Sequence, residues 1–285
     1  MENNAIAEVI GKEYKCLDKG FVRLVDVMGD DSSIVQAARV SYGKGTKSFS
    51  EDRGLIRYLM RHSHTSPFEM VELKFHVKLP IFVARQWIRH RTANVNEYSG
   101  RYSEMRDEFY LPDANQIRSQ SSDNKQGRSE NELAQDVINQ ILQKMQNLQK
   151  ASYSDYIYYL ENNLARELAR INLPLSTYTE WYWKIDLHNL FHFLKLRMDT
   201  HAQYEIRVYA DIIAAIIKQI LPISYEAFED YELNAIRFSK NELEVLADLI
   251  DKAKLTNIQA SDYGFTKSEW KELEEKFNKF IKNKE

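Results

Sequence analysis

Residues 71–79 constrain the fold more than any other segment, because apolar and polar side chains alternate strictly along VELKFHVKL. Successive side chains of an extended strand point to opposite faces, so a period of two predicts a strand with one buried and one solvated face. One solvated face is typical of antiparallel sheets. We therefore expect residues 71–79 to form a strand of an antiparallel sheet.

Helices are expected to make up most of the remaining chain. Glycine and proline are scarce, with 9 and 5 residues among 285, and apolar residues recur at helical spacing in several segments. Helices are predicted over residues 31–42, 52–62, 81–88, around 137–148, and over 164–173, 181–199 and 204–221. These elements indicate an α+β fold, with a small antiparallel sheet flanked by long helices.

Three local features qualify this outline. A short strand is expected within residues 17–28, and Asp31 or Ser32 is the expected N-cap of the helix that follows. The polar stretch 113–135 is interpreted as a mobile surface excursion.

The last part of the chain differs in character from residues 1–235. Residues 236–285 are charged and helical in pattern, and both Ser239 with Glu242 and Thr266 with Glu269 have the spacing of a helix-capping box. We expect a main domain over residues 1–235 and a charged helical C-terminal extension over residues 236–285.

The bulk composition limits the partners and the compartment. The formal net charge is -3, so the chain as a whole is not a binder of nucleic acid. The single cysteine, Cys16, excludes an internal disulfide and suits a reducing cytoplasm. The N-terminus lacks the pattern of a signal peptide, and no segment reaches the ~20 apolar residues that a membrane-spanning helix needs. We expect a cytoplasmic protein that binds no membrane.

Arginine is concentrated between residues 85 and 106, where no lysine occurs. A planar guanidinium binds phosphate or carboxylate through two parallel hydrogen bonds. Gly100 lets the backbone come close to a ligand beside this cluster. In the alternative interpretation the arginines form a solvated face, or they pair with Glu97, Glu104 and Asp107. The pattern favours a site for a phosphorylated small molecule. The cluster comprises Arg85, Arg89, Arg91, Arg101 and Arg106.

Within this cluster, RHRTANVNEYS over residues 89–99 resembles the signature of the flavin-dependent thymidylate synthases, in which Arg-His-Arg is followed after seven residues by serine. Other segments similar to this family follow in the family's order and extend over roughly residues 15–230. They are SPFE, LPIFVARQWIRHR, NEYSGRY, LARINLPL and LRMDTHAQYEI.

The resemblance implies an enzyme that methylates deoxyuridylate (dUMP) to thymidylate (dTMP). The carbon would come from methylenetetrahydrofolate, and the hydride from FAD that NADPH has reduced. The resemblance also implies catalysis by residues 1–235 and a homotetramer whose sites are shared between subunits. Several fixed cations would then serve the pyrophosphate of FAD and the phosphate of dUMP.

The family's flavin contacts match positions in four segments of this sequence. Asp186 and His192 depart from the family, where asparagine occurs, and an ionised aspartate accepts hydrogen bonds but donates none. The matching residues are Ser41, Ser66, Arg89, His90, Arg91, Glu97, Asp186, Leu187, His188 and His192.

The family's dUMP contacts match residues on both sides of the arginine cluster. Arg101 and Arg170 are the expected phosphate contacts. Arg197 is the expected catalytic residue, because a positioned guanidinium stabilises negative charge that develops on the uracil ring. The full set is Gln86, Arg89, Glu97, Tyr98, Ser99, Gly100, Arg101, Arg170 and Arg197.

Other functions fit the sequence less well. His188 and His192 have the i, i+4 spacing of a zinc-binding pair, but no HExxH motif accompanies them, so no metal site is expected. An RNA-binding protein would interleave arginine and tyrosine as this cluster does, but the net charge argues against it. The aromatic run 181–183 and Cys16 are interpreted as core residues, although the former has the chemistry to stack a flavin or folate ring.

Overall fold

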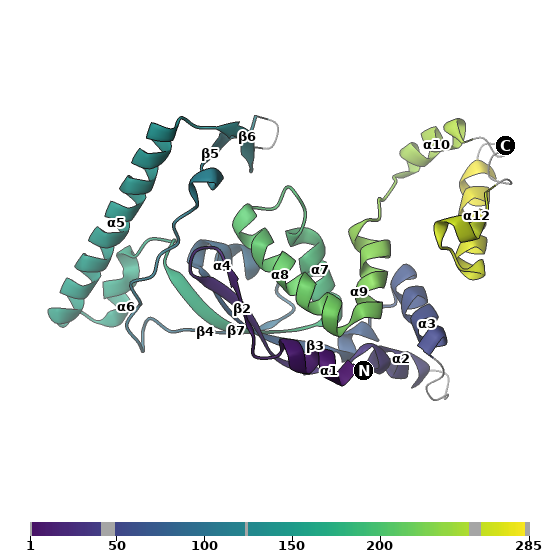
Figure 1. Ribbon diagram of the computed structural model, residues 1–285, viewed down its shortest axis with the longest axis horizontal. Helices are drawn as coiled ribbons and strands as arrows, with labels where there is room; N and C mark the ends of the chain where they lie inside the picture. The colour runs from purple at the N-terminus through teal and green to yellow at the C-terminus, as the bar shows by residue number, and fades with distance from the viewer. Residues whose placement is uncertain (1, 41–48, 123–124, 251–257, 283–285) are drawn as a thin grey trace. The chain divides into compact units, whose positions relative to one another are not determined.

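The computed structural model describes residues 2–40, 49–122, 125–250 and 258–282 of the chain (Figure 1). They form two compact units, Met1–Leu233 and Asn234–Glu285. The first unit contains both sheets and most helices, and the second contains only helical elements among its described residues. No helix within these ranges is long and apolar enough to cross a bilayer.

A five-stranded sheet forms the centre of the first unit. Its strand order is β1-β2-β3-β7-β4, and every neighbouring pair is antiparallel. The predicted fold class, a small antiparallel sheet with long helices, is confirmed. The strands are β1 (Glu13–Cys16), β2 (Gly20–Met28), β3 (Glu72–Pro80), β4 (Asn94–Glu97) and β7 (Tyr178–Asp186).

The alternation predicted for residues 71–79 is confirmed in β3. Phe75 and Val77 are fully buried and lie opposite Trp183 and Trp181 of β7. On the other face, the His76 ring stacks on Tyr182 with their centroids 4.9 Å apart. Cross-strand apolar pairs of this kind hold the two strands in register, because a shift by one residue would expose them.

Three helices cover the apolar face of this sheet (Figure 1). Helix α4 (Ile81–Trp87) packs on β3, α7 (Leu187–Arg197) on β7, and α8 (Tyr204–Ile220) on β1 and β2. Trp87 joins all three helices to the sheet. Its ring lies 5.0 Å from Trp183, 4.7 Å from Phe193 of α7 and 5.8 Å from Tyr209 of α8. The remaining helices of this region are α1 (Glu2–Val9), α2 (Asp31–Val40), α3 (Phe49–Arg61), η1 (Phe68–Met70), α9 (Pro222–Phe228) and η4 (Glu229–Leu233).

The predicted N-cap of α2 is wrong by one residue. Asp30 accepts the backbone N–H of Ser33 at 2.9 Å and therefore caps the helix. Asp31 is buried, at 3% exposure, and its carboxylate accepts the backbone N–H groups of Ile223 and Ser224 at the start of α9. Asp31 thus joins two helices that are far apart in the sequence.

The predicted helix over residues 181–199 is wrong in its first part. Residues up to Asp186 belong to β7, where Trp181, Trp183 and Ile185 are buried at a period of two. Asp186 then caps α7 by accepting the backbone N–H of Asn189 at 2.9 Å. Tryptophans at i and i+2 cannot share one face of a helix, which is why the strand is favoured here.

The middle of the chain is also less helical than expected. Helix α5 (Gln135–Glu161) confirms the long helix around residues 137–148. The helix predicted over 164–173 is shorter, with α6 (Arg166–Ala169) continued by the 3-10 turn η3 (Arg170–Asn172). It ends there because Leu173 is extended before Pro174. The polar stretch 113–135 contains a hairpin that was not predicted. Its elements are η2 (Ala114–Gln116), β5 (Arg118–Gln120) and β6 (Arg128–Glu132).

The second unit contains α10 (Lys240–Leu249), η5 (Ala260–Tyr263) and α12 (Lys267–Lys282). Ser239 and Glu242 form the predicted capping box at the start of α10. Thr266 and Glu269 form the same reciprocal pair of hydrogen bonds before α12. Both capping predictions are confirmed.

Replacing Asp31 with asparagine is expected to destabilise the first unit by about 1–3 kcal/mol. In the native chain both carboxylate oxygens of Asp31 accept backbone N–H groups. In the variant an NH₂ group replaces one of these oxygens, so two buried donors face each other. The free energy of unfolding in urea measures the effect. Asp113→Asn, at an exposed position, is the control, and equal stability of both variants and the parent would contradict the assigned role of Asp31.

Candidate active site

The arginine-rich segment begins where α4 ends. Val83, Ala84 and Trp87 are the buried residues of this helix, so its axis is fixed against the sheet and the chain leaves the core at Ile88. Arg89 and Arg91 are then exposed, and His90 is half-buried. The predicted helix over residues 81–88 is confirmed.

This segment and helix α7 enclose a pocket of about 360 Å³. One wall is formed by Arg89, His90 and Arg91. The other is formed by Arg197 together with His192 and Asn189, which lie about one and two turns earlier in α7. Expected site residues from two distant segments therefore line one pocket. The full lining is Arg89, His90, Arg91, Thr92, Ile185, Asn189, His192, Leu196 and Arg197.

Arg197 and His90 are joined by a hydrogen bond in this pocket. The Arg197 Nε–H donates to His90 Nε2 at 3.0 Å, so His90 Nε2 carries no proton and the ring hydrogen is on Nδ1. Burial, followed by the charges of Arg197 and His192, lowers the pKa of His90 from 6.5 to about 4. His90 is thus neutral near pH 7 and leaves the positive charge of Arg197 in place.

Among the described residues, no acidic side chain pairs with the arginines that line this pocket. Within the part of the chain that the structure describes, neither Arg89 nor Arg91 forms an ion pair with a carboxylate. Elsewhere Arg101 pairs with Glu167 and Arg106 with Glu180. Among the described residues none of these arginines pairs with Glu97, Glu104 or Asp107, so that part of the alternative is wrong. All five arginines are exposed, as the other part, a solvated face, predicts. Unpaired guanidinium groups at a pocket suit an anionic ligand.

A second group of expected site residues lies after β4. A Cβ atom on Gly100 would come within 2.7 Å of Met105 Sδ and 3.2 Å of Arg170 Cδ, so only glycine allows this close approach. Arg101 lies 3.7 Å from Glu167, one turn before Arg170. The two expected phosphate contacts, Arg101 and Arg170, are thus on neighbouring segments.

Glu97 and Gln86 each have a partner within the chain. Glu97 accepts a hydrogen bond from the Thr179 hydroxyl at 2.8 Å, and it does not pair with Arg101. Gln86, on α4, donates through Nε2 to Gln203 Oε1. Neither residue lines the Arg197 pocket. The same holds for Tyr98–Arg101 and for Arg170.

The other expected flavin contacts lie mostly around the start of α7. Ser66 is exposed just before η1, and η1 packs against α7. Asp186 is occupied as the α7 N-cap, and Leu187 is fully buried, so only its backbone is available to a ligand. His188 is half-buried outside the pocket lining. Ser41 lies outside the described residues.

Two residues of α7 were missed by the sequence analysis. Asn189 and Leu196 line the pocket three residues before and four residues after His192. This is the spacing of one helix face, so the periodicity of α7 contained the necessary signal. Thr92 was missed although it directly follows the Arg-His-Arg motif.

The less favoured functions gain no support from the geometry. No group of three or more potential metal ligands occurs among the described residues. Trp181 and Trp183 are buried core residues, as interpreted, but Tyr182 between them is 44% exposed, because neighbouring side chains of a strand point to opposite faces. Cys16 is buried as well, and burial raises the pKa of its thiol to about 12, which is unfavourable for a nucleophile.

The chain is similar to known proteins over most of its length. Residues 23–223 match the family model described as thymidylate synthase complementing protein. The flavin-dependent thymidylate synthase of Treponema denticola is 61% identical over 239 residues, which cover 84% of this chain and 90% of that protein. The corresponding protein of Wolbachia pipientis wMel is 56% identical over 268 residues, covering 94% and 93%. A crystal structure of the UMP/dUMP methylase PolB from Streptomyces cacaoi, bound with 5-Br UMP, has a TM-score of 0.69 and 34% identity, covering 76% of this chain and 97% of that one.

Replacing Arg197 with glutamine is expected to raise the pKa of His90 above about 4 but to leave it below 6.5. Glutamine removes the charge, whereas burial, the larger cause, remains. NMR titration of the ring nitrogens measures the change, and the exposed His201 serves as the control. An unchanged His90 pKa in the variant would show that Arg197 does not act on it.

The same shift predicts how stability depends on pH. The folded pKa of His90 lies below the unfolded value, so the unfolded chain takes up a proton between pH 6.5 and about 4 and the folded chain does not. This group therefore destabilises the fold as the pH falls through that window.

Proposed function

The chain belongs to the flavin-dependent thymidylate synthase family, and we propose that it methylates dUMP to dTMP with methylenetetrahydrofolate as carbon donor and FAD, reduced by NADPH, as hydride carrier. The observation that carries this proposal is the pocket in which Arg89, Arg91 and Arg197 meet without a neutralising carboxylate among the described residues. FAD carries a pyrophosphate and dUMP carries a phosphate. Guanidinium groups without an acidic partner can bind both of these anionic groups.

The residues of this pocket suit a flavin. Arg89 and Arg91 offer donors to the pyrophosphate, and Asn189 offers an amide from the facing helix. We also assign to the cofactor Ser66, Glu97, His188 and His192. Asp186 caps α7 and Leu187 is buried at its start, so these two residues support the helix. When bound, FAD supplies the hydride that completes the methyl group.

We assign dUMP to Gln86, Arg89, the segment Glu97–Arg101, Arg170 and Arg197. Within one chain these residues fall into separate groups, because the second group does not line the Arg197 pocket. A homotetramer with sites shared between subunits would bring them together. Large apolar side chains near Arg170 are exposed in the single chain, at 51% for Leu168, 69% for Ile171 and 63% for Leu175, and they support such an assembly.

Arg197 is assigned the catalytic role. Before C5 of uracil can attack the one-carbon unit, the ring must be electron-rich. A fixed guanidinium stabilises negative charge at N3 and its neighbouring oxygens and so favours this attack. His90 accepts a hydrogen bond from Nε of Arg197 and leaves both terminal nitrogens of the guanidinium for the substrate. The neutral imidazole orients Arg197 without cancelling its charge.

The first compact unit is the proposed catalytic domain, because all described site residues lie within it. For the second unit we propose no part in the chemistry. The buried, unpaired thiol of Cys16 suits a reducing compartment, and we propose the cytoplasm.

The proposed activity is tested by tritium release from C5-labelled dUMP in the presence of FAD, NADPH and methylenetetrahydrofolate. Release is expected from the wild-type enzyme, and Arg197→Ala should lower the rate about 100- to 1000-fold, as for other lost transition-state donors, while FAD absorbance is retained. Wild-type protein without release would refute the function, and near-normal release by Arg197→Ala would refute the role of that residue.

Replacing Arg91 with alanine is expected to remove bound FAD. The variant loses a donor to the pyrophosphate from an exposed position, so the fold should remain intact. Flavin absorbance per chain after gel filtration measures occupancy, and Arg85→Ala, on the exposed side of α4 outside the pocket lining, is the control. An Arg91→Ala protein as yellow as the control would contradict the assignment.

A further inference from the structure

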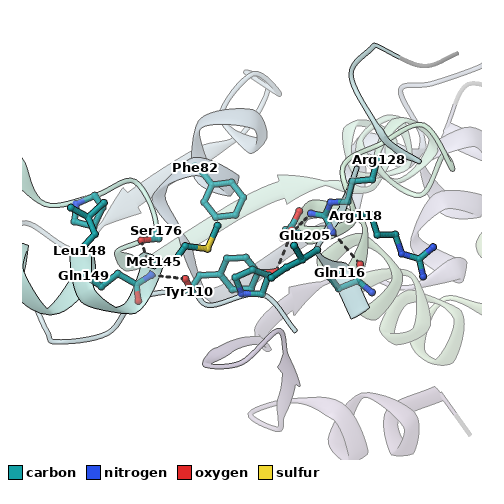
Figure 2. Close-up of a pocket in the computed structure, with 13 residues that line it drawn as sticks. Phe82, Tyr110, Gln116, Arg118, Arg128, Met145, Leu148, Gln149, Ser176 and Glu205 are labelled. Atoms are coloured by element: carbon teal, nitrogen blue, oxygen red, sulfur yellow. Dashed lines mark hydrogen bonds and ion pairs between the residues drawn. The ribbon is translucent and has the colours of Figure 1, made fainter. Parts of the chain in front are cut away.

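A buried carboxylate lies near the start of α8, away from the Arg197 pocket. Glu205 is 2% exposed and forms an ion pair with Arg128 of the β6 strand. Its Oε1 also accepts a hydrogen bond from the Tyr110 hydroxyl at 3.0 Å. Figure 2 shows Tyr110 and Arg128 converging on Glu205 at a pocket of about 400 Å³.

The second oxygen of this carboxylate leads to the proposed substrate site. Gln203 Nε2 donates to Glu205 Oε2 at 2.8 Å, and Gln203 Oε1 accepts from Gln86 Nε2. Gln86 is on α4, 117 residues before Gln203. A chain of hydrogen bonds therefore runs from Arg128 and Tyr110 through Glu205 and Gln203 to Gln86.

The direction of every hydrogen bond in this chain follows from the chemistry of its members. Arginine only donates, and an ionised carboxylate only accepts. Burial and the neighbouring Glu205 raise the pKa of Tyr110, so its hydroxyl keeps its proton and donates. Gln203 must then turn its NH₂ group to Glu205 and its carbonyl to Gln86, and Gln86 must in turn offer its NH₂ group.

We propose that Glu205 is a positioning residue that acts through Gln203 to fix which edge of the Gln86 amide is presented to dUMP. This inference rests on the proposed function, which assigns Gln86 to the nucleotide. A freely rotating Gln86 amide could present either its NH₂ group or its carbonyl oxygen to dUMP. The series of hydrogen bonds selects one of these two orientations before the substrate binds. The motif that supplies Gln203 and Glu205, AQYEI, thereby gains a role in substrate binding.

A purely structural role of Glu205 would be to hold the β5–β6 hairpin through Arg128. Two variants separate the roles. In Glu205→Gln, the new amide carbonyl accepts hydrogen bonds from Arg128 and Tyr110, so the new NH₂ group faces Gln203. The amides of Gln203 and Gln86 must then both turn over, which exchanges donor and acceptor in each hydrogen bond down to Gln86. In Gln203→Glu/Glu205→Gln, the carboxylate at position 203 accepts from both neighbours and restores the original orientation of Gln86. The contact with Arg128 is the same in both variants.

The dUMP dissociation constant of each FAD-loaded enzyme tests the proposal. We expect about 10-fold weaker binding for Glu205→Gln, the scale of one lost hydrogen bond that leaves two like groups facing each other. The exchanged double variant should bind within about 3-fold of wild type. Equal affinity of Glu205→Gln and wild type, or a double variant as weak as Glu205→Gln, would overturn the proposal.

Neutron diffraction from ligand-free crystals measures the orientation directly. Deuterium on Gln86 Nε2 should face Gln203 in the wild type, and deuterium on Gln203 should face Gln86 in Glu205→Gln. The same orientation in both would overturn the inference, whatever the substrate. A wild-type enzyme with the expected orientation but no affinity for dUMP would instead contradict the proposed function and the link to substrate.

Should Glu205→Gln not fold, Gln203→Leu interrupts the same chain at a half-buried position. We expect it to weaken dUMP binding several-fold with FAD content unchanged. Wild-type affinity in this variant would overturn the proposal.

Discussion

The packing of Trp87 is the interaction on which the site depends. Its fully buried ring contacts Trp181 and Trp183 of the sheet, Phe193 of α7 and Tyr209 of α8. The contacts with Trp181, Trp183 and Tyr209 are edge-to-face, and that with Phe193 is tilted. Several aromatic contacts of defined geometry fix both the position and the rotation of a helix. Because Arg89 and His90 follow two and three residues later, the same packing fixes where the Arg-His-Arg segment meets α7.

Charge is distributed differently at the site and in the rest of the molecule. Arg53 and Arg57 of α3 pair with carboxylates of α9 and η4, where they stabilise packing. Around the Arg197 pocket, by contrast, the described partner of the Arg197 guanidinium is the neutral ring of His90. An anionic ligand can then supply the compensating charge, which makes its binding favourable without first breaking an ion pair.

Asp31 and Glu205 are two buried carboxylates that orient the hydrogen-bond donors around them in the same way. Each is a nearly fully buried carboxylate, and each can only accept hydrogen bonds, so the donors around it have no choice of orientation. Asp31 fixes the backbone at the start of α9. Glu205 fixes a side-chain amide, and through it the proposed substrate contact Gln86.

The sequence alone determined the strand at 71–79, the helix at 81–88, both capping boxes and the membership of the family, because these depend on local spacing and short motifs. It did not reveal that residues 181–186 are a strand or that Asp31 serves α9, since both depend on neighbours far along the chain. The contact of Arg197 with His90 spans 107 residues and that of Gln86 with Gln203 spans 117. Only the tertiary structure decided these contacts, because a hydrogen bond needs two groups within about 3 Å and the path that brings them there is set by packing of the whole core.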